Sequence, residues 1–244
     1  TETNKLGYVA AYPFAEVISG YTAFYLGAKS VNPDVTMEIM YTNSWNDPTV
    51  ESQVAKALID RGCDVVSQHS DSTAPATTAE DNGVWQVGYN NDMIEAAPKA
   101  SLISARIDWG IYVTEAVEHV INGTEIPTDW CKGYGDGAVY LSPLNTAIAA
   151  EGTQEAVDAA WSSIKDGSLK VFDTSKFTCQ PAADGSYQVD ADGHVTSAFG
   201  LDSDGDFVND TGEAIVDGAF QESVLRSAPY FSLRIDGITE LNNN

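Results

Sequence analysis

The stretch Leu6–Val35, LGYVAAYPFAEVISGYTAFYLGAKSVNPDV, decides the fold class. Its opening apolar run predicts a short β-strand over Leu6–Ala11. From Phe14 onward, apolar side chains recur at helical spacing and form one stripe, which predicts an amphipathic helix. Asn32-Pro33-Asp34 ends that helix, and a new apolar run follows at once. The stretch therefore predicts a strand, a helix and the start of a second strand.

The same alternation continues to about residue 121. Asp47 and Pro48 predict the N-cap and first residue of a second helix, which Gly62 ends. Strand, helix, strand, helix at these spacings indicates an α/β fold, with a parallel sheet covered by helices on both faces. The remaining predicted strands are Val35–Tyr41, Cys63–Ser67, Gly83–Gly88 and Ala100–Ile107, and the remaining helices are Thr73–Glu80 and Tyr112–Ile121.

Beyond Thr124 the pattern becomes less regular and finally β-rich. Asp190-Ala191-Asp192-Gly193 lies between two β-like runs, which predicts a hairpin of Tyr187–Val189 and Val195–Phe199. The other predicted elements are a helix over Thr153–Ile164 and strands over Ala138–Leu141, Leu169–Phe172 and Pro229–Ile235.

The charge of the chain excludes some partners. The 244 residues include 36 acidic and 12 basic side chains, for a formal net charge of -24. Such a surface repels phosphate backbones, so we expect no nucleic-acid partner. It equally disfavours binding to an anionic membrane through a basic patch. The chain is long enough to bury a sizeable core.

The cysteines and the hydropathy pattern indicate little about function. Cys63 adjoins an apolar strand and is expected to be a buried thiol, whereas Cys131 and Cys179 can form a disulfide that the sequence alone does not decide. No apolar run is long enough to span a bilayer, and no signal peptide precedes the first strand.

Open α/β sheets bind ligands beyond the carboxyl ends of their strands. The segments at those ends are rich in aromatic, amide, hydroxyl and carboxylate groups, which suits a small polar ligand with a flat ring. They are Ala11–Phe14, Thr42–Asp47, Gln68–Ser72, Tyr89–Asp92 and Ile107–Gly110.

Several of these motifs resemble one known family. LGYVAAYPFAEVISGYTAFYLGAKSVNPDV, TNSWNDPTVESQVAKALIDRGCDVVSQHSDS, GVWQVGYNNDM, APKASLISARIDWGIYV and IKDGSLKVF together resemble the second lobe of the basic membrane protein family of ABC-transporter substrate-binding lipoproteins. The resemblance spans roughly residues 5 to 172, and the tail ending in APYFSLRIDGITEL is similar to longer members.

That resemblance implies a type I periplasmic-binding-protein fold, whose two lobes close on a ligand in the cleft between them. It implies a purine nucleoside or purine base as ligand, an ABC permease as partner and a place outside the cytoplasmic membrane. The lipid anchor and most of the N-terminal lobe would lie outside this chain. The expected organisation is a ligand-binding lobe over residues 1–124, a crossover with a helix and part of the other lobe over 125–177, and a β-hairpin with an acidic extension over 178–244.

The resemblance also assigns candidate ligand contacts. Trp45 occupies the aromatic position of a ring-stacking loop, and its polar neighbours favour a loop tip over a core position. Asn90 stands where the family often has a carboxylate, and an amide can still recognise a base edge. Glu16 lies at the first strand end, Phe14 and Trp109 have alternative roles in packing, and Asp92 has one in helix capping. The full set of expected contacts is Tyr12, Phe14, Asn43, Trp45, Asn46, His69, Ser70, Asp71, Asn90, Asp92, Arg106, Asp108 and Trp109.

A second candidate site is acidic. The segment 202–213 has the oxygen spacing of a calcium-binding loop, although its glycine is at position 4 instead of position 6, and a solvated acidic turn is the alternative. Its candidate calcium ligands are Asp202, Asp204, Asp206, Asp210 and Glu213.

Two other functions compete with solute binding. A sensory domain that acts on a partner protein would share the same fold, so the fold does not separate it from a transporter subunit. A hydrolase could use His69 beside Asp71 as an acid–base pair, but no G-x-S-x-G motif, phosphate loop or metal triad accompanies them. The sequence therefore favours a binding protein without catalytic residues.

Overall fold

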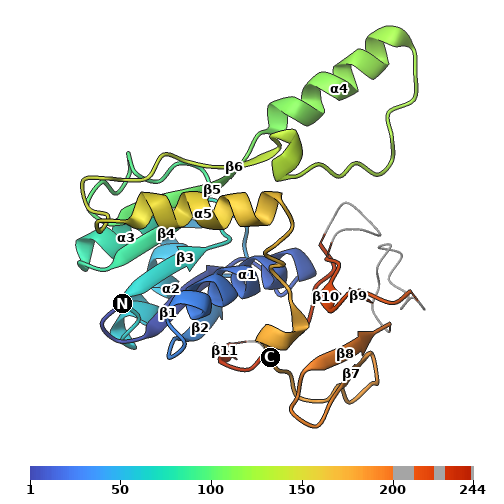
Figure 1. The fold of residues 1–244 in the computed structure, drawn as a ribbon. Coiled ribbons are helices and arrows are strands. Elements are labelled where there is room, and N and C mark those ends of the chain that lie inside the picture. The colour runs from blue at the N-terminus through green and yellow to red at the C-terminus, as the bar shows by residue number, and fades with distance from the viewer. Residues whose placement is uncertain (200–211, 223–228, 243–244) are drawn as a thin grey trace.

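A single seven-stranded sheet organises the molecule, with the strand order β11-β2-β1-β3-β4-β5-β6 (Figure 1). This computed structural model describes residues 1–199, 212–222 and 229–242. Strand pairs within the sheet are parallel except for β5 and β6, which are antiparallel. The strands are β1 (Lys5–Ala10), β2 (Thr36–Tyr41), β3 (Val65–Gln68), β4 (Trp85–Asn90), β5 (Ser101–Ile107), β6 (Val139–Leu141) and β11 (Ile238–Glu240).

Helices cover both faces of this sheet. Leu6 and Tyr8 of β1 pack with α1, whereas Val9 packs with α2. Because successive side chains of a strand point to opposite faces, α1 and α2 lie on opposite sides of the sheet. The predicted α/β fold with a largely parallel, covered sheet is confirmed. The helices are α1 (Ala15–Val31), α2 (Pro48–Asp60), α3 (Ala74–Asp81), α4 (Trp109–Asn122) and α5 (Thr153–Lys165), with short 3-10 turns η1 (Tyr134–Asp136) and η2 (Thr174–Lys176).

Local capping explains where α2 begins. The Asp47 carboxylate accepts hydrogen bonds from the backbone N–H groups of Thr49 and Val50, both at 3.1 Å. Glu51 Oε1 accepts in return from the Asp47 N–H at 2.9 Å. These contacts satisfy N–H groups that a helix start would otherwise leave unpaired. The predicted N-cap at Asp47 is confirmed.

The C-terminal part of the chain shares the main hydrophobic core. Phe177, Phe220 and Phe231 belong to the same buried cluster as Tyr21 and Tyr25 of α1. Helix α1 is therefore packed between the sheet and this C-terminal part. Two small antiparallel pairs lie here, β7 (Tyr187–Val189) with β8 (Val195–Ala198), and β9 (Ile215–Val216) with β10 (Ala219–Phe220) (Figure 1).

The hairpin predicted around residues 190–193 is confirmed, but two other predicted strands are wrong. Leu169–Phe172 and Pro229–Ile235 form no strand, although Phe172 and Phe231 are buried. An apolar run indicates burial, but a strand also needs a neighbouring edge with which to pair. Here the pairing goes to Ile238–Glu240 instead, which adds to the edge of β2.

Helix α4 carries an exposed apolar side. Like α5, it has no buried residue, and Val113, Val117, Val120 and Ile121 are all at least half exposed. Figure 1 shows it projecting beyond the rest of the fold together with the loop that follows it. Trp130 and Lys132 of that loop bind Glu115 of α4. One side of the helix is thus covered by its own loop, and the apolar side is not.

Two further expectations from the sequence can be compared with the structure. None of the three cysteines is in a disulfide, so the bond left open for Cys131 and Cys179 is not formed. Cys63 is buried as predicted, and burial raises the pKa of its thiol to about 12. Among the described residues, no helix combines the length and the apolar character that crossing a membrane requires.

Candidate functional site

Three aromatic rings meet at the carboxyl ends of β1 and β2. Tyr12 and Phe14 stack with ring centroids 5.1 Å apart, and Trp45 lies 5.4 Å from Tyr12 and 6.2 Å from Phe14. Phe14 is 53% exposed, so the packing role considered for it is wrong. It is the N-cap residue of α1, ahead of the helical stripe. We call Tyr12, Phe14 and Trp45 the aromatic cluster.

Backbone hydrogen bonds hold the Trp45 loop against the end of β1. The N–H groups of Thr42 and Asn43 donate to the carbonyl oxygens of Ala10 and Ala11, at 2.8 and 2.9 Å. Asn43 has a positive φ of 55°, a conformation that asparagine tolerates better than most residues. The tight turn brings Trp45 back over Tyr12. The side chains of Asn43 and Asn46 are exposed at the same edge.

The Trp45 loop is also joined to the loop after β3. The carbonyl oxygen of Trp45 accepts from the Asp71 N–H at 2.8 Å. Glu51 is fully buried below this junction, and its Oε2 accepts from the Ser72 hydroxyl at 2.6 Å. The two loops are thus fixed together, and this edge of the sheet is held in one arrangement.

His69 is buried within the fold instead of facing solvent. Its ring lies 4.1 Å from the Tyr89 ring and its Nδ1 lies 3.5 Å from Tyr8 Oη. A methyl group at Gly20 of α1 would come within 2.6 Å of Nδ1, so the glycine gives the imidazole its space. Burial lowers the His69 pKa to about 4, which keeps the ring neutral near pH 7.

Asp71 and Asn90 form a polar pair beside the aromatic cluster. Burial and the charge of Glu51 raise the pKa of Asp71, and a hydrogen bond from Asn90 opposes that rise. Asn90 adopts a positive φ of 63° at the end of β4. Among the described residues, His69 and Asp71 therefore have separate partners, which argues against the acid–base pair considered from the sequence.

Tyr89 is a member of this site that the sequence did not single out. Burial, together with the carboxylates of Glu16 and Asp71, raises its pKa to about 12. The hydroxyl thus stays protonated near pH 7 and can donate a hydrogen bond. Its position at the end of β4, next to Asn90, is the signal that could have identified it.

Ser70 and Arg106 each bring a buried hydrogen-bonding atom to the site. Ser70 Oγ and Arg106 Nε are buried and have no hydrogen-bond partner among the residues that the structure describes. The Arg106 guanidinium lies over the Tyr140 ring, 5.1 Å from its centroid, and Arg106 is aligned with Asn90 across the sheet. Buried polar atoms are normally paired, so both atoms are candidates for ligand contact.

The other predicted contacts have local structural roles or lie apart. Asp92 accepts from the Ile94 N–H at 3.0 Å in the turn between β4 and β5, where no helix forms, so the helix-capping role considered for it is wrong. Asp108 is the N-cap of α4 and accepts from the Gly110 N–H at 2.9 Å. Trp109 is 61% exposed on the projecting helix, and no ring contact in the described part of the chain joins it to the aromatic cluster.

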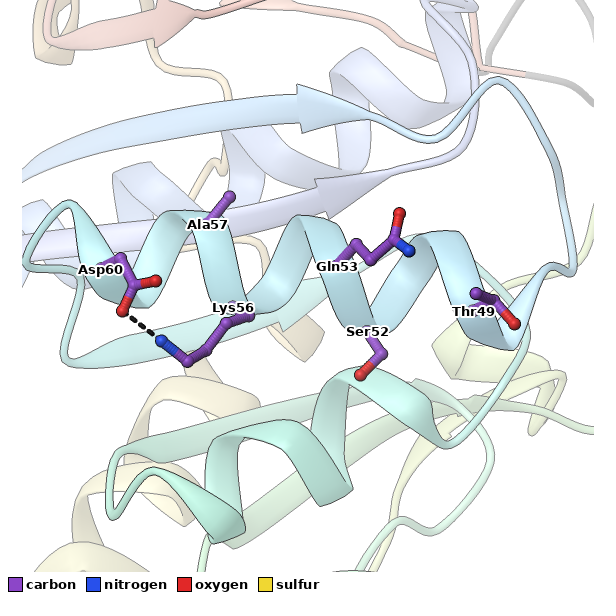
Figure 2. Close-up of a pocket in the computed structure, with 6 residues that line it drawn as sticks. All are labelled: Thr49, Ser52, Gln53, Lys56, Ala57 and Asp60. Atoms are coloured by element: carbon purple, nitrogen blue, oxygen red, sulfur yellow. Dashed lines mark hydrogen bonds and ion pairs between the residues drawn. The ribbon is translucent and has the colours of Figure 1, made fainter.

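One hollow lies elsewhere, on the outer face of α2 (Figure 2). It is open to solvent, and α2 provides its lining residues, Thr49, Ser52, Gln53, Lys56, Ala57 and Asp60. Lys56 and Asp60 pair with each other along the surface of α2 (Figure 2). The hollow contains none of the aromatic or buried polar groups of the strand ends, so it is not the binding site that the sequence predicts.

Most of the predicted calcium loop, residues 202–211, lies outside the residues that the structure describes. Four of its five candidate ligands are in that part: Asp202, Asp204, Asp206 and Asp210. Glu213 is described, and its carboxylate accepts from the backbone N–H groups of Ala198 and Ile215, both at 2.8 Å. Within residues 1–199, 212–222 and 229–242, no three His, Cys, Asp or Glu side chains form a group that could hold a metal ion.

Comparison with known proteins supports the same interpretation. Residues 1–173 match the model of the Bmp family, described as ABC transporter substrate-binding protein PnrA-like. A purine-binding protein of Brucella abortus is 36% identical over 68% of this chain and 47% of its own length. A putative ABC transporter glucose-binding protein of Haloferax volcanii is 36% identical over 72% of this chain and 45% of its own.

A solved structure shows the same fold. The solute-binding protein of an ABC transporter system from Conexibacter woesei superposes with a TM-score of 0.54, at 22% identity, over 69% of this chain and 57% of that protein. The chain spans a little under half the length of the two curated relatives. By the match over residues 1–173, the chain belongs to the Bmp family of PnrA-like ABC transporter substrate-binding proteins.

Proposed function

We propose that this chain provides one ligand-binding lobe of an ABC importer's solute-binding protein, and that its ligand is a purine nucleoside or purine base. The aromatic cluster carries the proposal, because three rings within about 6 Å of one another offer a stacking surface for a flat heterocycle. The purine-binding relative from Brucella abortus supports the same ligand class.

The polar side of the site suits the edge of such a ligand. Asp71 and Glu16 can accept hydrogen bonds from amino or hydroxyl groups, and Tyr89 can donate one. The strand-end segments contain several carboxylates and no lysine or arginine, and Arg106 directly precedes the last of them. A phosphorylated ligand would be repelled by those carboxylates, so the proposal is limited to nucleosides and free bases.

Glucose is a second candidate, because the relative from Haloferax volcanii is named as a glucose-binding protein. Sugars also pack their apolar faces on aromatic rings and donate hydroxyl hydrogen bonds to carboxylates. The same aromatic cluster and the same Asp71–Asn90 pair would then contact a pyranose. Direct binding measurements separate the two ligands.

A second lobe would complete the site. The apolar side of α4 is exposed in this chain, and the curated relatives are about twice as long as the matched segment. We propose that the second lobe packs on α4 and closes over the aromatic cluster. The complete protein would act outside the cytoplasmic membrane, held there by a lipid anchor, and would deliver its ligand to an ABC permease. Its role would be binding and not catalysis.

Thermal unfolding with adenosine, guanosine, inosine, adenine, hypoxanthine and glucose tests the proposal. Ligand at a hundred times its Kd stabilises the folded state by about 2.7 kcal/mol, which raises the Tm of a domain of this size by roughly 5 to 10 °C. Millimolar ligand compensates for weak binding by one lobe. A shift with purines supports the proposal, a shift with glucose alone replaces it by the second candidate, and no shift with either ligand contradicts both.

Trp45→Ala then tests the aromatic cluster. Stacking on a base contributes about 1 to 3 kcal/mol, so the Kd for the purine should rise about 5- to 140-fold. Trp85→Ala is the matched control, because Trp85 is 40% exposed at the start of β4, away from the carboxyl ends of the strands. Equal losses in both variants would show that the aromatic cluster has no special role.

A further inference from the structure

The C-terminal residues 238–242 hold the end of β2. Strand β11 pairs parallel to β2, and the Leu241 N–H donates to the Ile39 carbonyl at 2.9 Å. Asn242 then contacts the backbone of Tyr41 on both sides: its Oδ1 accepts from the Tyr41 N–H at 2.8 Å, and its Nδ2 donates to the Tyr41 carbonyl at 2.9 Å. One side chain thus satisfies both backbone groups of the last residue of β2.

Glu240 joins β2 to α1. Its Oε1 accepts from the Tyr21 hydroxyl of α1 at 2.6 Å and from the Tyr41 hydroxyl at 2.9 Å, and it pairs with Arg234 at 2.7 Å. Burial raises the pKa of both tyrosines, so both hydroxyls remain donors near pH 7. Hydrogen bonds to a charged acceptor are stronger than neutral ones.

Both elements held in this way lead directly into the aromatic cluster. Tyr41 precedes the loop that carries Trp45, and that loop is hydrogen-bonded to the end of β1 just before Tyr12. Helix α1 begins immediately after Phe14. A shift at the end of β2 or along α1 would therefore move one ring of the cluster against the other two.

We propose that Glu240 and Asn242 are positioning residues that hold the aromatic cluster in its binding arrangement. Both residues lie beyond the segment matched by the family, which ends at residue 173. The C-terminal part of the chain is thereby a component of the ligand site. The effect on affinity rests on the proposed function, whereas the effect on the position of Trp45 does not.

The experiment compares Asn242→Ala, Glu240→Gln and the control Thr239→Ala in the full 244-residue chain. Thr239 is exposed on the same strand, and within the described part of the chain its side chain makes no hydrogen bond to β2 or α1. The near-ultraviolet circular dichroism of Trp45 is obtained by subtracting the spectrum of a Trp45→Phe partner in each background, well below the Tm. Adenosine affinity is measured in parallel.

We expect a reduced Trp45 signal and about fivefold weaker adenosine binding in Asn242→Ala and Glu240→Gln, the loss that one or two hydrogen bonds imply. Thr239→Ala should match the parent in both measurements. A purely structural role would lower the Tm and leave the Trp45 signal and the affinity unchanged, and that result overturns the proposal.

Two further outcomes keep the test decisive. If Asn242→Ala does not fold, Asn242→Asp retains the acceptor for the Tyr41 N–H and loses the donor, so an intermediate Trp45 signal is expected and a parental one overturns the proposal. If the parent binds none of the purines and no glucose, the proposed function fails, and the Trp45 signal still decides whether these residues position the cluster.

Discussion

Glu38, near the amino end of β2, accepts hydrogen bonds from two cations. Arg61 donates to both of its oxygens, at 2.6 and 2.9 Å, and Lys5 lies 2.9 Å from Oε1. The Arg61 hydrogen bonds and the Lys5 contact hold the pKa of Glu38 at about 2, against burial, which opposes them. The carboxylate therefore stays ionised in the folded protein at pH values where the unfolded chain would already bind a proton.

We therefore expect Glu38 to stabilise the folded protein only within a defined pH range. Because the folded-state pKa is the lower one, the contribution is complete above the unfolded pKa of about 4.5 and disappears as the pH falls toward 2. Glu38→Gln should cost about 1.5 to 3 kcal/mol in the free energy of unfolding at pH 7 and roughly 40% of that at pH 3. Denaturant unfolding at both values checks this, with the exposed Glu95→Gln as control. A loss that is equal at both pH values would contradict the ion-pair explanation.

Single residues were predicted best where their neighbours in sequence determine their surroundings. Trp45 sits among polar residues that mark a loop, and the structure places it at the aromatic cluster. The burial of His69 could not be predicted in this way, because it depends on Tyr89 and on the space left by Gly20, which are both distant in sequence. Tyr89 was overlooked because its surroundings also come from other strands.

At the scale of elements, the start of α2 gives a direct prediction. Replacing a capping carboxylate by alanine costs about 1 kcal/mol, or roughly 2 to 4 °C in Tm for a domain of this size. Asp47→Ala should show that loss in thermal unfolding, whereas Asp47→Ser, which retains a side-chain acceptor, should keep most of the stability. If both variants melt alike, the hydrogen bonds of Asp47 to Thr49 and Val50 contribute nothing measurable.

Elements with a clear period were predicted from the sequence, and those without one were not. The strands β1 to β5 and the helices between them follow from alternating apolar runs and helical stripes. Strand β11 has three residues and a mixed pattern, so nothing local distinguishes it from Pro229–Ile235, which buries its apolar side chains and forms no strand. It forms a strand because it pairs with the free edge of β2, and that edge exists only once the sheet is assembled.

For the whole molecule, the net charge of -24 predicts that salt stabilises the fold. Mutual repulsion of the carboxylates destabilises the compact state, and the Debye length falls from about 10 Å at 0.1 M salt to about 3 Å at 1 M. The Tm should rise steadily over that range of sodium chloride. Sucrose at matched osmolality is the control for nonspecific stabilisation. A Tm that falls with sodium chloride would mean that surface ion pairs outweigh the net repulsion.

The α/β class could be predicted from the sequence, whereas the packing of the C-terminal part of the chain against α1 could not. The candidate site stays a prediction that the binding measurements test. The shared core between α1 and the C-terminal phenylalanines depends on contacts between distant segments. Neither composition nor periodicity encodes such contacts.

Strand β11 is synthesised long after β2, and this order affects how the chain folds during synthesis. Asn242 contacts Tyr41 across 201 residues, so β2 leaves the ribosome long before its outer neighbour exists. Until then, the N–H and C=O groups along that border of the sheet are open to pairing with strands of other nascent chains. Closing so large a loop is also slow, because its entropy is lost before any contact forms. Biogenesis of this protein therefore passes through a stage in which the border of β2 needs protection, by a chaperone or by dilution.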